Sequence, residues 1–421
     1  MNNLIEKMEN HNIIYISVNP ERALGLEKIL PNFYIVSLLD SYIFNFLNKD
    51  KFYSLKKESP NIDINENSKE LLLQDGVRNY INQFKNPSFM FFKITSGIEL
   101  ILEKHKILNS TSYLNKLYEN KINIVEYFKD MIPKSIPYIP GNTTYNDLKK
   151  NIGDKFVIQF IHGHSGESTF FINNKDEFDQ IKNKYPERFS KAVRFVEGDT
   201  YTINGIVTKK GIYVFNLSKQ ITGIQSLTQY IGGTVGNDWL VQLPEKIRLD
   251  LLNRMNSIGE RLEKNGYKGL FGADFIYDGS NIYLLDLNPR ENASVPTFTK
   301  IQIKNKIVPA KLIHILEFLN IEYEIDIESY NQQIFNDLNL RQIIIRNTKD
   351  SVIKMEGDIN GIYDNNLKKI REEYDIGNID NNEFLILSTK GDIDTNMEIA
   401  RIQTKNHIKK SKIDQILEII N

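Results

Sequence analysis

GLFGADFIYDGSNIYLLDLNPR, residues 269–290, is the stretch that decides the fold of this chain. It contains two apolar runs, 270–277 and 282–287, whose branched and aromatic residues are typical of β-strands. The residues between the runs are Asp-Gly-Ser-Asn, a cluster of turn formers. The stretch therefore predicts a β-hairpin.

Oxygen-bearing side chains interrupt these apolar strands. Asp274 lies inside the first strand, and Asp286 and Asn288 end the second. Side chains two residues apart share one face of a strand, and the fold-back of the hairpin brings Asp274 beside that pair. Two carboxylates and an amide oxygen are hard ligands suited to Mg²⁺ held together with substrate phosphates. Arg290, two residues further along, is placed to clamp a phosphate or a carboxylate.

The composition limits the classes of function. The chain has 421 residues, 41% of them hydrophobic and 25% charged, as in multidomain globular proteins. Its 53 basic and 54 acidic residues give no bulk charge for binding nucleic acid or an acidic membrane surface. The absence of cysteine excludes disulfides, thiol nucleophiles and cysteine-ligated metals. Because the N-terminus also lacks an apolar signal core, we expect a cytoplasmic enzyme with no nucleic-acid or membrane partner.

The N-terminal part of the chain has an alternating pattern. Short apolar runs at 13–18, 33–38 and 88–94 are separated by polar or helical segments, including a predicted helix over 21–30. Strands that alternate with helices are typical of βαβ units and a doubly wound parallel sheet. We therefore predict an α/β domain over residues 1–110.

The remainder divides into two further predicted domains. Residues 115–130 are predicted to form a helix followed by a proline-rich linker, and the polar segment 50–67, within the first domain, is predicted to be a loop or an insertion. Beyond the linker, strand-like runs dominate, and we predict an α+β domain with largely antiparallel sheets over 111–330. A small C-terminal domain is expected over 331–421.

The order of these domains, together with the hairpin, resembles the carboxylate–amine ligases of the ATP-grasp superfamily. In that family a similar hairpin binds metal, which makes Asp274 the first acidic ligand and Asp286 and Asn288 the acidic–x–Asn pair. Asp286 stands where glutamate is more usual. The resemblance implies an ATP-grasp fold of α/β and α+β domains, with a doubly wound N-terminal domain and a small C-terminal one.

The stretch IHGHSGEST at 161–169 lies between two predicted strands. Its glycines allow positive φ angles, and successive backbone N–H groups in such a loop can bind phosphate. A simple hairpin loop is the alternative. The stretch resembles the phosphate-covering loop of ATP-grasp enzymes, which implies five ATP-binding residues: Gly163, Ser165, Gly166, Ser168 and Thr169.

Two positions concern positive charge near the phosphates. Gln159 stands where many members of the family carry a phosphate-binding lysine, and glutamine supplies no charge. The resemblance offers Lys121, predicted to begin a helix, as the source of that charge. A solvated helix lysine is the alternative for Lys121.

The segment RFVEG at 194–198 ends an apolar strand. It resembles the family hinge that binds adenine through the backbone, while a carboxylate holds the ribose. This implies ATP-binding roles for Arg194, Phe195, Val196 and Glu197. An exposed acidic turn is the alternative reading of this segment.

The segment 219–236 is rich in Gly, Thr and Gln, so it is a candidate to line or close a pocket for the acceptor substrate. An ordinary surface loop is equally consistent with it. Asn292 and Ser294 follow Arg290 and are candidates for the same site.

The resemblance implies an ATP-dependent, ADP-forming ligase that joins a carboxylate substrate to an amine substrate through an acyl-phosphate, on amino-acid-like molecules. ATP and Mg²⁺ are the expected cofactors, Arg290 is the expected catalytic residue, and homodimers are common among such ligases. Two alternatives stay open. One is a carboxylase-like enzyme that activates bicarbonate, and the other is a non-catalytic nucleotide-binding regulatory protein, for which Gln159 and Asp286 leave room.

Overall fold

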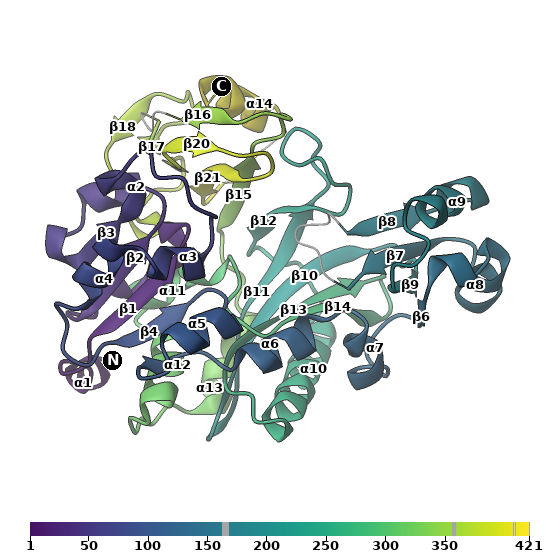
Figure 1. Ribbon diagram of the computed structural model, residues 1–421, viewed down its shortest axis with the longest axis horizontal. Helices are drawn as coiled ribbons and strands as arrows, with labels where there is room; N and C mark the ends of the chain where they lie inside the picture. Colours follow the sequence, from purple (N-terminus) through teal and green to yellow (C-terminus); the bar gives the residue numbers. More distant parts are fainter. Residues whose placement is uncertain (162–167, 356–358, 407, 409, 421) are drawn as a thin grey trace.

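A long antiparallel sheet runs through the centre of the computed structural model, which describes residues 1–161, 168–355, 359–406, 408 and 410–420. A parallel sheet lies on one side of it, and a small antiparallel sheet protrudes on the other (Figure 1). Among the described residues, no helix is long and apolar enough to cross a membrane.

The N-terminal sheet is parallel, with the strand order β3-β2-β1-β4-β5. Its strands are β1 (Ile13–Ser17), β2 (Phe33–Ser37), β3 (Phe52–Ser54), β4 (Ser88–Phe91) and β5 (Lys106–Ile107). All residues of β1 and β4 are buried, because both faces of the sheet are covered. The helices of this part are α1 (Asn2–Glu6), α2 (Leu55–Glu58), α3 (Ser68–Leu72), α4 (Asp75–Ile81) and α5 (Ser96–Ile101).

One prediction for this region is wrong, and a loop describes only part of a second segment. The segment 21–30 forms two short 3₁₀ turns, Pro20–Arg22 and Leu26–Lys28, because Gly25 between them has φ +116° and packs so closely on Thr299 that no Cβ would fit. The segment 50–67 is not all loop, since it contributes edge strand β3 and helix α2.

The helix predicted over 115–130 is divided into α6 (Ser112–Glu119) and α7 (Asn123–Tyr127). The side chain of Asn120 accepts a hydrogen bond from the backbone N–H of Ile122, at 2.9 Å, and this local turn interrupts the helix. Lys121 therefore lies in a turn between two helices and does not begin one.

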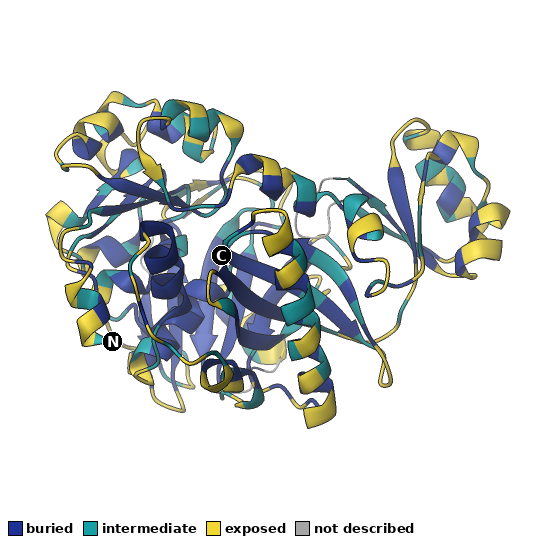
Figure 2. Cartoon of the chain, turned by 90° about the horizontal axis from the view of Figure 1, so that it is seen from below, coloured by how far each residue is buried: buried dark blue, intermediate teal, exposed yellow. Residues whose placement is uncertain are grey.

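The small sheet has the strand order β6-β9-β7-β8. Its strands are β6 (Ser135–Tyr138), β7 (Phe156–Phe160), β8 (Thr169–Ile172) and β9 (Ser190–Arg194). Helices α8 (Tyr145–Ile152) and α9 (Lys175–Lys184) cover one face, where Phe156, Ile158 and Phe178 form a separate core. This part protrudes from the rest of the molecule (Figure 2). Its other face, which carries Val157 and Gln159, is free to line a pocket.

The central sheet begins with the predicted hairpin. Strands β13 (Gly269–Tyr277) and β14 (Ile282–Asn288) pair with each other, and β13 pairs with β10 (Asp199–Thr208). The sheet continues through β11 (Gly211–Thr222) and β12 (Thr234–Asp238). One long helix, α10 (Glu245–Lys264), packs on β10 and β11 through residues such as Leu251, Met255 and Ile258. The hairpin prediction is thus confirmed.

The C-terminal strands extend the same sheet. β12 pairs with β15 (Arg341–Arg346), and the order continues β21-β19-β17-β18. These strands are β17 (Gly361–Tyr363), β18 (Lys369–Arg371), β19 (Phe384–Ser388) and β21 (Glu398–Thr404), and β16 (Ile353–Met355) pairs separately with β20 (Gly391–Ile393). The remaining helices are α11 (Val295–Lys304), α12 (Ala310–Leu319), α13 (Ile327–Asn331) and α14 (Lys410–Ile420).

Candidate active site

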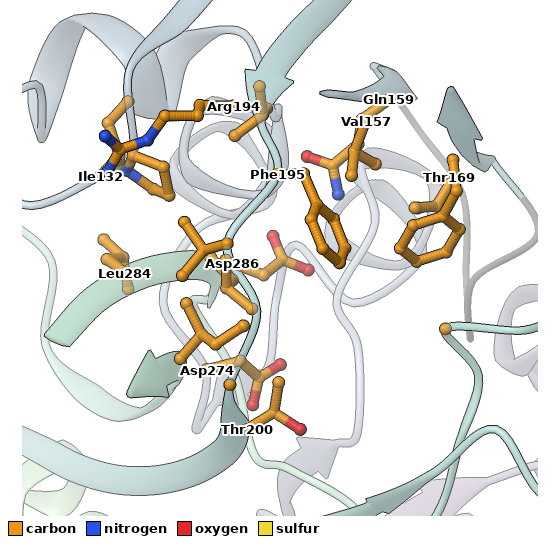
Figure 3. A pocket seen from close by; sticks show the side chains of 18 of the residues that line it. Ile132, Val157, Gln159, Thr169, Arg194, Phe195, Thr200, Asp274, Leu284 and Asp286 are labelled. Atoms are coloured by element: carbon orange, nitrogen blue, oxygen red, sulfur yellow. The ribbon is translucent and has the colours of Figure 1, made fainter. Parts of the chain in front are cut away.

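A pocket of about 420 Å³ lies between the small sheet and the β13–β14 hairpin. Figure 3 shows Gln159 and Thr169, from the small sheet, on one side of this pocket and Asp274 and Asp286, from the hairpin, on another. The connection between β9 and β10 also contributes, through residues 194–198. Such a cavity, apolar in part and with convergent polar groups, is typical of a small-molecule site.

The wall made by the small sheet has two cross-strand rows. Strand pairing places Val193, Val157 and Phe171 in one row across β9, β7 and β8. The row two residues along β7 consists of Lys191, Gln159 and Thr169. All six side chains line the pocket. This wall therefore has an apolar half and a polar half.

The opposite wall repeats this order. Ile276 and Leu284 of the hairpin line the pocket, and two residues away along their strands lie Asp274 and Asp286. Ile276 and Asp274 lie two apart on β13 and share a face of that strand, so an apolar and a polar position follow one another there. On β14 the register shift beside Asp274 interrupts this alternation between Leu284 and Asp286. The polar positions of both walls line the same pocket, where the charge of Asp286 raises the pKa of Lys191 against the effect of burial.

The two carboxylates of the hairpin are directly paired, since Asp274 lies opposite Asp286 in the register of β13 and β14. Asp274 Oδ1 accepts hydrogen bonds from Thr202 Oγ1 at 2.7 Å and Gln220 Nε2 at 2.9 Å. Burial raises the pKa of Asp274 to about 7, and the neighbouring Asp286 adds to this rise. A divalent cation would relieve both effects, so the pair fits Mg²⁺.

Asn288 and Arg290 are bonded to each other. Arg290 Nη2 donates to Asn288 Oδ1 at 3.0 Å, and Arg290 Nε donates to Glu119 Oε1 at 2.8 Å. Lys93 forms an ion pair with the other oxygen of Glu119 at 2.5 Å. Burial alone would raise the pKa of Glu119, but the charges of Arg290 and Lys93 outweigh it and the pKa is lowered. Glu119 is thus an anion that fixes the Arg290 guanidinium.

The predicted metal ligands therefore differ in position. Asp274 and Asp286 line the pocket, whereas Asn288 Oδ1 is engaged by Arg290 and is not among the described lining residues. Within the described part of the chain, no group of three or more His, Cys, Asp or Glu side chains could hold a metal ion. The donors that remain in the pocket are the two carboxylates, which suit a Mg²⁺ ion that takes its other ligands from phosphates and water.

Of the residues predicted near the phosphates, Lys121 and Gln159 both line the pocket. Lys121 is 8% exposed, so the solvated-lysine alternative does not describe it. The structure adds Lys191, which sequence reasoning missed and which is directly opposite Gln159. Its sequence signal is weak, because the same strand also carries Ser190 and Arg194.

The predicted hinge, residues 194–198, consists of the last residue of β9 and its connection to β10. The backbone N–H of Phe195 donates to Lys155 O at 3.2 Å, and its ring packs edge-on against Phe171. The backbone of Val196 makes no hydrogen bond with any residue in the described ranges, so its N–H and C=O remain for a ligand. Glu197 lines the pocket and is exposed. Arg194 instead donates to Tyr283 Oη at 3.2 Å and covers its ring.

The glycine-rich stretch is described in part. Gly163, Ser165 and Gly166 lie outside the described residues. Ser168 is buried, and its hydroxyl has no hydrogen-bond partner within the part of the chain that is described. Thr169 begins β8 and lines the pocket.

The segment 219–236 reaches the same pocket. Gln220, Thr222, Ile231, Gly232 and Thr234 are among the lining residues. The two other candidates do not lie there. Asn292 is buried against Gly272, and Ser294 accepts a hydrogen bond from Asn216, so both belong to the interior.

Known proteins are similar to this chain in sequence. The model of the ATP-grasp domain family matches residues 118–294. Tyramine–L-glutamate ligase of Methanocaldococcus jannaschii is 23% identical over 293 residues, 68% of this chain and 79% of that protein. The arginine-specific carbamoyl phosphate synthase large chain of Halalkalibacterium halodurans is 22% identical over 203 residues, 46% of this chain and 18% of the relative. The chain thus spans less than a fifth of that relative's length.

Solved structures with a similar fold cover nearly the whole chain. N5-carboxyaminoimidazole synthase from Aspergillus clavatus matches with a TM-score of 0.60 at 10% identity, over 98% of this chain and 100% of that one. The biotin carboxylase domain of 2-oxoglutarate carboxylase from Hydrogenobacter thermophilus matches with a TM-score of 0.61 at 13% identity, over 97% and 89%. Residues 118–294 thus match an ATP-grasp domain, which confirms the resemblance, and the similar solved structures confirm the predicted fold class.

Proposed function

We propose that the protein is an ATP-dependent, ADP-forming ligase that joins a carboxylate to an amine. The observation that carries this proposal is the pairing of Asp274 with Asp286 at the polar end of a pocket whose other end is apolar, with Arg290 two residues past the hairpin. The similarity to tyramine–L-glutamate ligase over most of both chains supports an amino-acid-like substrate.

The pocket is apolar at one end and polar at the other, which matches the adenine and the phosphates of a nucleotide. We propose that adenine lies between the apolar rows, with one donor and one acceptor supplied by the backbone of Val196, and that Glu197 reaches the ribose. The triphosphate then lies along the polar rows, near Lys121 and Thr169. Asp274 and Asp286 would hold Mg²⁺, which neutralises phosphate charge when bound. Asn288 would join them when the Arg290 side chain moves from Asn288 to the substrate.

The proposed chemistry has two steps. A carboxylate oxygen of the first substrate attacks the γ-phosphorus of ATP, the bond to the bridging oxygen breaks, and ADP leaves an acyl-phosphate. The amine nitrogen of the second substrate then attacks the acyl carbon, inorganic phosphate leaves, and the nitrogen loses a proton. Arg290, held by Glu119, would bind the transferring phosphoryl group and the oxyanion of the second step. The protein's task is mainly to position the reactants and to exclude water.

A second cavity, of about 600 Å³, offers room for a substrate beside Arg290. It lies at the carboxyl ends of β1 and β4, where open parallel sheets usually bind ligands. Phe92 lines this cavity and also contacts Arg290. The guanidinium carbons of Arg22 and Arg290 lie 4.7 and 4.8 Å from the centroid of the Phe92 ring. Arg22 and Arg346 line the cavity, and each has a buried nitrogen without a partner among the described residues. We propose that an anionic group of one substrate binds there.

The test is phosphate release from Mg·ATP in the presence of amino acids and small carboxylic acids, singly and in pairs, with products identified by mass. We expect release that depends on a pair and a product mass equal to the two substrates less water. Release that depends on bicarbonate would instead favour the carboxylase-like alternative. Nucleotide binding without release in any combination would favour the regulatory alternative. An Asp286→Asn variant provides the background rate.

A further inference from the structure

Lys191 is a buried cation on β9. Its side chain is 2% exposed, and it forms no ion pair or hydrogen bond with any residue that the structure describes. Burial lowers the pKa of Lys191 to about 8, although the charge of Asp286 opposes this shift. Burying an unpaired ammonium destabilises a fold, so such a group usually has a ligand.

The position of Lys191 indicates which ligand that is. Lys191 on β9 lies directly opposite Gln159 on β7, and both side chains line the pocket. Directly paired residues have Cβ atoms about 5 Å apart, so long side chains from either position reach the same region. Thr169 continues the row on β8. This polar row lines the same pocket as Asp286. The apolar row of Val193, Val157 and Phe171 lies next to it on the sheet.

We propose that Lys191 supplies the positive charge that binds the nucleotide phosphates, in place of a lysine at position 159. This inference rests on the proposed function as far as the ligand is a nucleoside triphosphate. A lysine contributed by β9 approaches the phosphates from the neighbouring strand while keeping the charge on the same face of the sheet. Gln159 then donates a neutral hydrogen bond beside it.

Moving the lysine across the strand pair tests this inference. The Lys191→Gln variant removes the charge, and the Gln159→Lys/Lys191→Gln double variant restores the same two side chains in exchanged positions. Binding of adenylyl imidodiphosphate with Mg²⁺, a non-hydrolysable ATP analogue, is measured by calorimetry, and binding of adenosine is measured in parallel. We expect Lys191→Gln to weaken the analogue by roughly 30-fold or more without changing adenosine binding. We expect the double variant to recover at least about tenfold of that loss.

Two controls separate charge from folding. Lys150→Gln removes an exposed lysine from α8, which packs on the same small sheet as Lys191, and should leave binding unchanged. Thermal unfolding of Lys191→Gln without ligand should occur at or above the wild-type temperature, because a lone buried charge is removed. If Lys191→Gln does not fold, the double variant decides by itself, since it retains the charge in the pocket.

The inference is overturned if Lys191→Gln binds the analogue like wild type, if adenosine binding falls equally, or if a folded double variant binds no better than Lys191→Gln. These measurements need no acceptor and no turnover. Failure to find any ligation product therefore counts against the proposed function while leaving the role of Lys191 intact. A wild-type protein that binds adenosine but not the analogue would overturn both.

Discussion

Asp274 and Asp286 face one another across the β13–β14 hairpin, and each interrupts an otherwise apolar strand. Two like charges at directly paired positions destabilise a hairpin. Thr202 and Gln220 hold only Asp274, so the structure itself does not neutralise the pair. We propose that a cation shared by the two carboxylates accounts for their presence.

Replacement of Asp286 tests that account. We expect Asp286→Asn to lower Mg·ATP-dependent turnover by roughly 100-fold or more, because a charged ligand is lost at the phosphates. Thermal stability without ligand should stay the same or rise, since one of two opposed charges is removed. Turnover is followed by phosphate release and stability by thermal unfolding. Equal turnover in wild type and variant would remove the hairpin from the mechanism.

Arg290 should act on the reaction more than on nucleotide binding. We expect Arg290→Lys to lower kcat by about 10²-fold or more while changing ATP-analogue binding only a few-fold, because lysine cannot form the planar, two-point contact of a guanidinium. Arg254→Lys, on the half-buried i,i+4 pair with Asp250 of α10, is the matched control and should leave both kcat and analogue binding unchanged. A loss of analogue binding as large as the loss of kcat would assign Arg290 to nucleotide binding instead.

His314 should make the fold sensitive to acid. It is buried between the N-terminal domain and the hairpin, where its Nδ1 accepts from the N–H of Leu270 at 3.0 Å and its Nε2 lies 2.7 Å from Leu108 O. Burial lowers the pKa of His314 to about 4, although the bond to Leu108 opposes the shift. Between pH 6.5 and 4 the unfolded chain therefore binds more protons than the folded one.

It follows that His314 removes up to about 3 kcal/mol of unfolding free energy as the pH falls through this window. A His314→Gln variant should be less stable than wild type at pH 7 but should lose less stability between pH 6.5 and 4. Urea unfolding at a series of pH values measures both slopes. Parallel slopes for the two proteins would show that other groups cause the acid sensitivity.

Glu291 and Lys311 form a buried ion pair at 3.0 Å, and Tyr15 Oη donates to the other carboxylate oxygen at 3.0 Å. Glu291→Gln leaves a buried ammonium without its counter-ion, so we expect a loss of roughly 3–5 kcal/mol of unfolding free energy. Adding Lys311→Met should restore part of that loss. The two variants are compared by denaturant unfolding, and a double variant less stable than the single one would contradict this reasoning.

Sequence alone predicts the hairpin well, because strand alternation and turn formers are local signals. It does not predict the register shift beside Asp274, which sets Asp274 opposite Asp286. Lys191 is missed for a similar reason. Its burial depends on the pairing of β9 with β7, strands that a helix and a third strand separate along the chain.

The errors in the N-terminal part also have tertiary causes. The helix predicted over 21–30 is broken at Gly25, whose conformation is required by a close contact with Thr299, far away in the chain. The roles of Gly163, Ser165 and Gly166 remain predictions from the family resemblance, as do those of the hinge residues.

The pairing of β12 with β15 has a consequence for attempts to shorten the chain. A fragment ending near residue 340 would keep every residue of the nucleotide pocket but would leave the backbone of β12 uncovered along one side. Such an open strand can recruit another copy of itself and aggregate. The last strands thus cover the edge of β12 in the central sheet. A minimal soluble version of this protein must retain them or replace their hydrogen bonds.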